Sequence, residues 1–343
     1  MTDAQRTRRS VLKSGAALAG LGLVGSLGGC VGDDDGSAEG SGGFSLSVVP
    51  GDVDGLVHVD VTALLGDDAV RSAADSIIAE QEQVDVGSFD EALDEVESEV
   101  GVDPEGVNDL AVFGADTTES AAVVLWTEFD SDELVSTIEE ETGEDVEEDT
   151  YEGQTIYRID GDPAAELDDG VFVAGDGAMV ERVIDTWDGR ADPLDGPVRD
   201  AFESAEEGYA RFGFTPTEEI ENDSTPAVQA IEAVSGSLYP DGDDRVVEVS
   251  VGTETEEAAA DLEELLEAFV ADLEQAAEEG SPFVSEELVT EIQERVSYEA
   301  DGSALSIVYR ASADDFADFV GEALGGLLLG LLGIPTGSAD TTA

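Results

Sequence analysis

The sequence is almost free of lysine, histidine and cysteine. Its 343 residues include one cysteine, Cys30, one histidine, His58, and one lysine, Lys13. These counts exclude a disulfide framework, a zinc site built from Cys and His, a thiol nucleophile with a histidine partner and a lysine Schiff base. Only 13 basic residues stand against 84 acidic ones, which also excludes a basic nucleic-acid-binding surface.

The acidic residues are too numerous for an ordinary protein surface. The formal net charge is −71, yet 41% of the residues are hydrophobic. Disordered chains combine high charge with low hydrophobicity, so we expect a packed core with carboxylates on its surface. Molar salt shortens the Debye length to about 3 Å and screens their mutual repulsion. The composition resembles that of haloarchaeal proteins, which implies a fold that is stable in concentrated salt.

The first 30 residues carry an export pattern. Residues 7–13 read Thr-Arg-Arg-Ser-Val-Leu-Lys, with the arginine pair at Arg8 and Arg9. This resembles the twin-arginine signal, although Val11 stands where phenylalanine is commonest. An apolar, Gly-rich stretch follows, too short to be a permanent membrane span. It ends in Leu-Gly-Gly before Cys30, which resembles the lipobox of secreted lipoproteins.

These motifs together resemble the twin-arginine-exported lipoproteins of haloarchaea. The resemblance covers residues 1–30 and implies that residues 1–29 are a signal peptide and that Cys30 carries a lipid. It also implies two partners, the export machinery and the membrane, and a location on the outer face of the cell membrane. Residues 30–43 are rich in Gly, Ser and Asp and predict a flexible tether.

The remaining chain predicts an α+β fold with mixed or antiparallel sheets and packed helices. We expect a first half over residues 44–200, a second over 201–334 and a disordered tail over 335–343. A strand, a capping residue and a helix follow one another at 121–142, 246–279 and 304–324. This recurrence indicates two duplicated halves, unless it reflects only the capping chemistry that any α+β protein uses.

Several element boundaries follow from periodicity. Apolar residues spaced three and four apart predict helices over 70–78 and 89–100. Residues 236–239 and 246–251 predict a hairpin, preceded by a helical region that reaches Val234. Thr253 with Glu256 and Ser312 with Asp315 predict capping boxes.

His58 is the first residue to consider for catalysis. It shares a strand face with Asp60, which is placed to orient an imidazole. No Gly-x-Ser-x-Gly motif provides a nucleophile, so a structural histidine is the better interpretation. Acidic pairs are so common in this chain that they do not indicate a glycosidase site. Trp126 and Trp187 could line a sugar site, but the periodicity places both in the core.

Calcium is the metal that the acidic turns of this chain could bind. Acidic turns occur at residues 52–55, 160–162 and 241–244, but none matches the EF-hand loop. Diffuse sodium or potassium association is the simpler expectation. The sequence therefore predicts no cofactor, no metal site and no catalytic residue.

The C-terminal region carries an unusual apolar stripe. It consists of Phe316, Phe319, Val320, Ala323, Leu324, Leu327, Leu328, Leu331 and Leu332. This spacing predicts one helix over residues 316–332, and its charge-free part from Ala323 to Ile334 is too short to span a bilayer. Three interpretations remain open: a core helix docked on the sheet, a helix lying in the membrane, or a self-associating or partner-binding helix.

The sequence favours a lipid-anchored, extracellular, non-enzymatic protein that acts as a binding or envelope-interaction module. Two alternatives remain. A solute-binding lipoprotein of a transporter would show two lobes around a ligand cleft, and a carboxylate-based hydrolase would need a deep pocket with convergent acids.

Overall fold

The structure is a computed structural model, and it describes residues 43–80, 86–100, 103–115, 120–142, 146–159, 161–216, 225–280 and 285–316. The export signal, Cys30, nearly all of the tether, the turn residue Asp160 and the apolar segment after Phe316 lie outside these ranges. So do the predicted tail and the predicted sites at Arg8 and Arg9.

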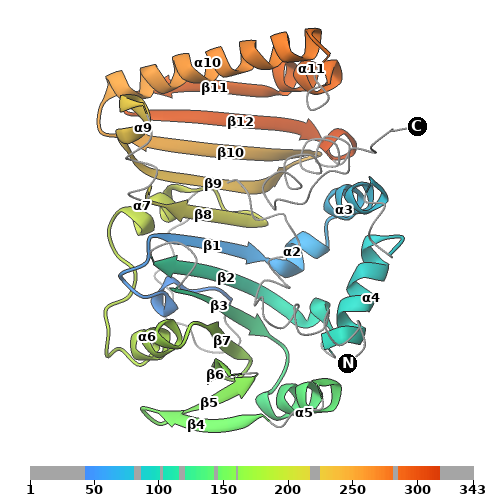
Figure 1. Cartoon of the computed structure of the whole chain (residues 1–343), viewed down its shortest axis with the longest axis vertical. Helices are drawn as coiled ribbons and strands as arrows, with labels where there is room; N and C mark the ends of the chain where they lie inside the picture. The colour runs from blue at the N-terminus through green and yellow to red at the C-terminus, as the bar shows by residue number, and fades with distance from the viewer. Residues whose placement is uncertain are drawn as a thin grey trace, which may run out of the picture.

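In the described part of the chain, strands and helices form an α+β fold, as the sequence predicts. The strands are β1 (Gly55–Asp60), β2 (Val107–Ala115), β3 (Ser120–Thr127), β4 (Glu147–Tyr151), β5 (Gln154–Ile159), β6 (Asp162–Asp168), β7 (Val171–Gly175), β8 (Ala210–Phe214), β9 (Ile231–Asp241), β10 (Asp244–Thr253), β11 (Val296–Asp301) and β12 (Ala304–Ser312). They make one twelve-stranded antiparallel sheet in the order β11-β12-β10-β9-β8-β1-β2-β3-β7-β6-β5-β4 (Figure 1).

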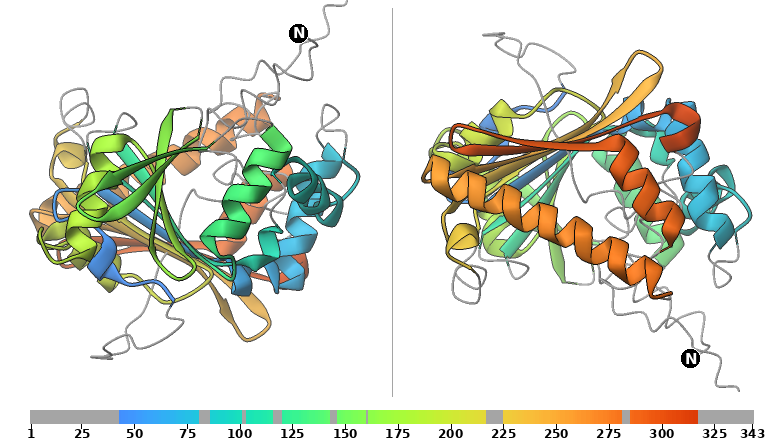
Figure 2. Two further views of the ribbon diagram at one scale, coloured as in Figure 1. Left: turned by 90° about the horizontal axis from the view of Figure 1, so that it is seen from below. Right: turned by 90° about the horizontal axis from the view of Figure 1, so that it is seen from above.

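Helices lie on both faces of this sheet (Figure 2). They are α2 (Val61–Leu65), α3 (Asp68–Glu80), α4 (Phe89–Val100), α5 (Ser131–Thr142), α6 (Gly177–Trp187), α7 (Pro197–Ser204), α9 (Pro226–Gln229), α10 (Glu256–Glu278) and α11 (Glu286–Arg295), with short 3-10 turns η1 (Leu46–Val48) and η2 (Pro104–Gly106). No helix within the described ranges is both long and apolar enough to span a bilayer.

The two halves of the sheet share one strand order. In each half, three consecutive strands form a meander, β1-β2-β3 or β8-β9-β10. A helical connection follows, and the last strand of the half returns to pair with the third strand of its meander, β7 with β3 and β12 with β10. The meanders meet where β1 pairs with β8, so both halves lie in one continuous sheet. The duplication itself and the boundary near residue 200 stay predictions.

One face of the sheet, which we call the α6 face, carries the largest core. Leu56 on β1, Phe113 on β2 and Val124 on β3 point to this face and pack against η1, α6 and α7. Asp176 caps α6 by accepting hydrogen bonds from the N–H groups of Ala178 and Met179. The apolar side of α6 supplies much of this core.

The opposite face, which we call the α10 face, is covered in separate places. Val70 and Ala73 of α3 pack against Leu238 and Tyr309 of the sheet. Leu262 of α10 packs with Leu305 over the outer strands. Helix α4 packs against α3 and α5 at one side of this face. The predicted helices around 70–78 and 89–100 are confirmed as α3 and α4.

Two sequence predictions are wrong in detail. No helix reaches Val234, because α9 ends at Gln229 and β9 begins at Ile231. Thr253 does not cap α10; its hydroxyl donates to the carbonyl oxygens of Thr255 and Ser303, and Thr255 accepts the capping bond from the Ala258 N–H. Thr253 is the last residue of β10, so its side chain binds the neighbouring strand connection instead.

One hairpin and one helix cap agree with the sequence prediction, whereas two strands were not predicted. The hairpin of β9 and β10 is confirmed, as is the Ser312 cap, which accepts from the Asp315 N–H. Strands β4 and β6 were missed because their sequences are mostly acidic and small.

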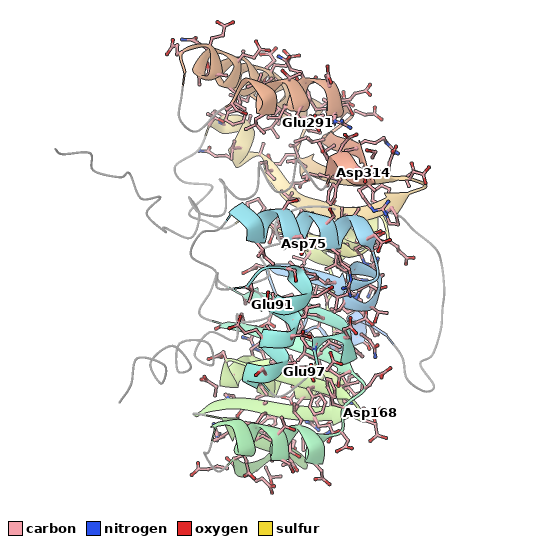
Figure 3. All side chains as sticks on the ribbon, turned by 90° about the vertical axis from the view of Figure 1, so that its right-hand side faces the viewer. Asp75, Glu91, Glu97, Asp168, Glu291 and Asp314 are labelled. Carbon is pink, nitrogen blue, oxygen red and sulfur yellow. The ribbon has the colours of Figure 1, made fainter. Side chains whose placement is uncertain are left out.

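On the side of the molecule shown in Figure 3, carboxylates such as Glu91 and Glu291 cover the helices.

Candidate functional site

A cavity of about 370 Å³ lies where β1 meets β8, at the junction of the two halves. The Asp60 N–H donates to the Tyr209 carbonyl there, and His58 lies opposite Arg211 in the strand register. The cavity is lined by His58, Asp60, Ala63, Glu207, Gly208, Tyr209, Arg211 and Pro240. Neither Tyr209 nor Arg211 was singled out from the sequence.

His58 is oriented by Asp109, not by Asp60. The imidazole Nε2–H donates to Asp109 Oδ1 across 2.8 Å, and His58 is 8% exposed. Asp60 instead accepts from the Ala63 N–H at 2.8 Å and caps α2. The predicted pairing is wrong because Asp60 ends β1, where the first turn of the helix takes its carboxylate.

The other nitrogen of His58 is buried without a partner. Within the described residues, Nδ1 has no hydrogen bond. The Phe44 ring stacks on the imidazole with ring centroids 4.2 Å apart, and Trp126 and Phe202 pack around Phe44. A buried nitrogen left unpaired costs about 1–3 kcal/mol, so this ring is held by its aromatic neighbours and by Asp109.

The two tryptophans belong to the core, as predicted. Trp126 is 5% exposed in the core of the α6 face, and Trp187 packs against the same core while partly buried. Neither residue lines the cavity.

Arg211 is the most unusual charge in the site. Among the arginines of the described ranges, it alone forms no ion pair with a carboxylate, and its guanidinium lies 4.4 Å from the centroid of the Phe202 ring. Burial lowers the pKa of Arg211, and the charges of Glu207 and Glu203 oppose that shift only in part. Within the described residues, therefore, no carboxylate contacts this cation of the cavity.

Tyr209 forms another wall of the cavity and has a structural bond. Its hydroxyl donates to Asp67 Oδ2 at 2.6 Å, and Arg245 pairs with the same carboxylate. Burial, with the hydrogen bond to Asp67, raises the pKa of Tyr209 to about 12. This phenol is therefore neutral at physiological pH and is engaged in the fold.

The arrangement is suited to binding. Arg211 is available to an anionic oxygen, and the described residues that line the cavity include no serine, threonine or cysteine. A catalytic role would depend on His58 Nδ1 acting alone as a base.

Two of the three acidic turns considered for calcium contact arginines. Arg182 pairs with Asp52, and Arg310 lies 2.6 Å from Asp241 and 3.5 Å from Asp244. In the described ranges, no three His, Cys, Asp or Glu side chains are grouped so as to hold a metal ion.

No protein-family model matches the chain, and no curated protein matches its sequence. Solved structures of TP0453 are similar in arrangement. Crystal form III has a TM-score of 0.46 at 10% identity and covers 82% of this chain and 99% of that chain. Crystal form I has a TM-score of 0.42 at 11% identity, with coverage of 82% and 97%. Likeness at this level says nothing about the ligand or activity of this chain.

Proposed function

We propose that this chain is an exported, lipid-anchored binding protein of a halophile and not an enzyme. The export and anchoring parts of the proposal are supported by the motifs around Arg8, Arg9 and Cys30. The binding part is supported by the cavity between β1 and β8. Its ligand is a small solute with an anionic group.

The observation that carries the binding proposal is the unpaired guanidinium of Arg211. The chain has 84 acidic residues, yet none of those in the described ranges forms an ion pair with the partly buried Arg211. Asp60 and Tyr209 are already engaged in structural hydrogen bonds. Glu207 also lines the cavity, which favours a ligand that carries a hydrogen-bond donor or a positive group beside its anionic group.

The two alternative functions fit the structure less well. A solute-binding lipoprotein of the two-lobed kind closes about a hinge, whereas here both halves share one sheet through β1 and β8. A carboxylate-based hydrolase needs free convergent acids, whereas Asp60 caps a helix in this cavity and Asp109 holds His58.

Ligand binding is tested by thermal unfolding in about 3 M KCl with small carboxylates, phosphates and zwitterions. A ligand of this site raises the melting temperature of the wild type and leaves Arg211→Gln unchanged. Arg158→Gln is the matched control, because Arg158 pairs with Asp149 on an outer strand pair. If no solute stabilises the wild type, or if Arg211→Gln responds equally, the binding proposal is wrong.

Anchoring is tested by fractionating the native host. We expect the wild-type protein in the membrane fraction, Cys30→Ser released from the membrane, and Arg8→Lys/Arg9→Lys retained in the cytosol with its leader. Membrane association of Cys30→Ser equal to that of the wild type would overturn the anchor.

A further inference from the structure

An apolar strip crosses the centre of the sheet on the α10 face. Its middle row, in strand register, is Val249, Gly236, Phe212, Val57, Val112, Val123 and Ala174. The flanking rows on the same face contain Val251, Val234, Phe214, Gly55, Gly114 and Ala121 on one side, and Val247, Leu238, Ala210, Val59, Leu110, Leu125 and Phe172 on the other. The strip contains no charged residue, although 28% of the chain is charged.

The described helices leave this strip partly uncovered. Val57, Val112, Val123 and Phe212 are partly exposed and belong to none of the buried clusters. Phe214 is 37% exposed. A contiguous apolar surface of this kind marks a contact with another apolar partner.

The last described residue of the chain lies against this strip. Phe316 is 3% exposed, its ring centroid lies 6.5 Å from that of Tyr309, and it packs in one cluster with Leu238 of the strip. The Ser312 cap opens a helical turn just before it. The chain therefore leaves the described region on the α10 face, beside the end of the strip that β10 and β9 form.

The sequence that follows matches the strip in polarity and length. Residues 317–334 contain only two charges, Asp318 and Glu322, and none after position 322. As a helix, residues 316–334 would extend about 27 Å at about 1.5 Å per residue. The strip crosses seven strands, which at about 4.8 Å between strands is about 29 Å.

We infer that residues 317–334 cover the apolar strip on the α10 face. Because the segment is continuous with Phe316, its local concentration at the strip exceeds that of any free partner. This docking selects one of the three interpretations that the sequence left open. It does not depend on the proposed ligand site, whose Arg211 faces α7 on the α6 face.

Disulfide cross-linking in the full chain tests this contact, because Cys30→Ser leaves no other thiol. Val112→Cys is combined in turn with Leu324→Cys, Leu328→Cys and Leu331→Cys, since a disulfide requires Cα atoms within about 7 Å. Under mild oxidation in concentrated KCl, at least one pair is expected to cross-link within one chain. Val308→Cys with Leu328→Cys is the matched control, because Val308 is a partly exposed valine on the opposite face and should not react.

Two cross-linking outcomes overturn the proposal. Cross-links formed only between chains would show that a second copy occupies the strip, and equal reaction of the Val308 control would show no preference for this face. Maleimide labelling provides a second measurement. Val112→Cys should react slowly in the full chain and severalfold faster when Leu324→Asp and Leu328→Asp are added, with circular dichroism confirming the fold. An unchanged labelling rate in the folded variant also overturns docking.

Discussion

Asp67, Tyr209 and Arg245 join three parts of the molecule at one carboxylate. The Arg245 and Asp67 side chains are 12% and 8% exposed, and Asp67 also accepts from the N–H groups of Ala69 and Val70 at the start of α3. The network ties α3 to β10 and to the residue before β8. Buried ion pairs of this kind specify an arrangement more than they stabilise it, but removal of one partner is costly.

We expect Arg245→Met to destabilise the fold by about 3–5 kcal/mol, because it leaves the Asp67 carboxylate buried without its cation. Urea unfolding in concentrated KCl measures the change. The double variant Arg245→Met/Asp67→Leu should recover much of the loss. If the single variant has the same free energy of unfolding as the wild type, the network is not a structural link.

Asp67 also makes stability depend on pH. Burial alone would raise its pKa, but hydrogen bonds from Arg245, Tyr209 and Val70 outweigh burial and hold the pKa below its usual 3.8. Its contribution is complete above the unfolded-state pKa and is lost as the pH falls through the lower folded-state value. The stability difference between wild type and Asp67→Asn should therefore be constant from pH 7 to about 5 and shrink below about 4. A difference that stays constant down to acid unfolding contradicts this assignment.

At the scale of elements, α7 lies unusually close to β8. A Cβ added at Gly213 would lie 2.6 Å from the Phe202 nitrogen and 2.9 Å from the Val198 oxygen, both backbone atoms of α7. The close approach places Phe202 beside Arg211 and Phe44, so the geometry of the candidate site depends on this glycine.

We expect Gly213→Ala to destabilise the fold by about 1–3 kcal/mol, because α7 must move away from the strand. Gly252→Ala on β10 is the control, since its added Cβ would meet only the Ala233 oxygen at 3.6 Å. Thermal unfolding of both variants in the same buffer makes the comparison. Equal melting temperatures would show that α7 is not fixed by this contact.

For the molecule as a whole, surface charge is the dominant property. The net charge is −71, and exposed carboxylates of the described part lie on helices and strands, as Glu97 and Asp168 illustrate in Figure 3. We therefore expect the compact state to depend on salt that screens this repulsion.

We expect the circular dichroism spectrum to show the native fold above about 1 M KCl and its loss in dilute buffer. The transition should follow ionic strength, with NaCl and KCl nearly equivalent. A spectrum that is the same in both conditions would contradict the halophilic interpretation.

The amino-acid sequence by itself determined the α+β class, most helices and the hairpins, because these follow from local periodicity and capping. It also placed Trp126 and Trp187 in the core. Tertiary structure alone decided the single sheet, since pairing of β1 with β8 joins residues about 150 positions apart in the chain. For the same reason, the sequence points to Asp60 as the partner of His58, whereas the bonded carboxylate is Asp109, a diagonal neighbour on another strand that leaves no local signal. No sequence pattern distinguishes Arg211 from the other arginines, because the absence of a contacting carboxylate is a property of three-dimensional packing.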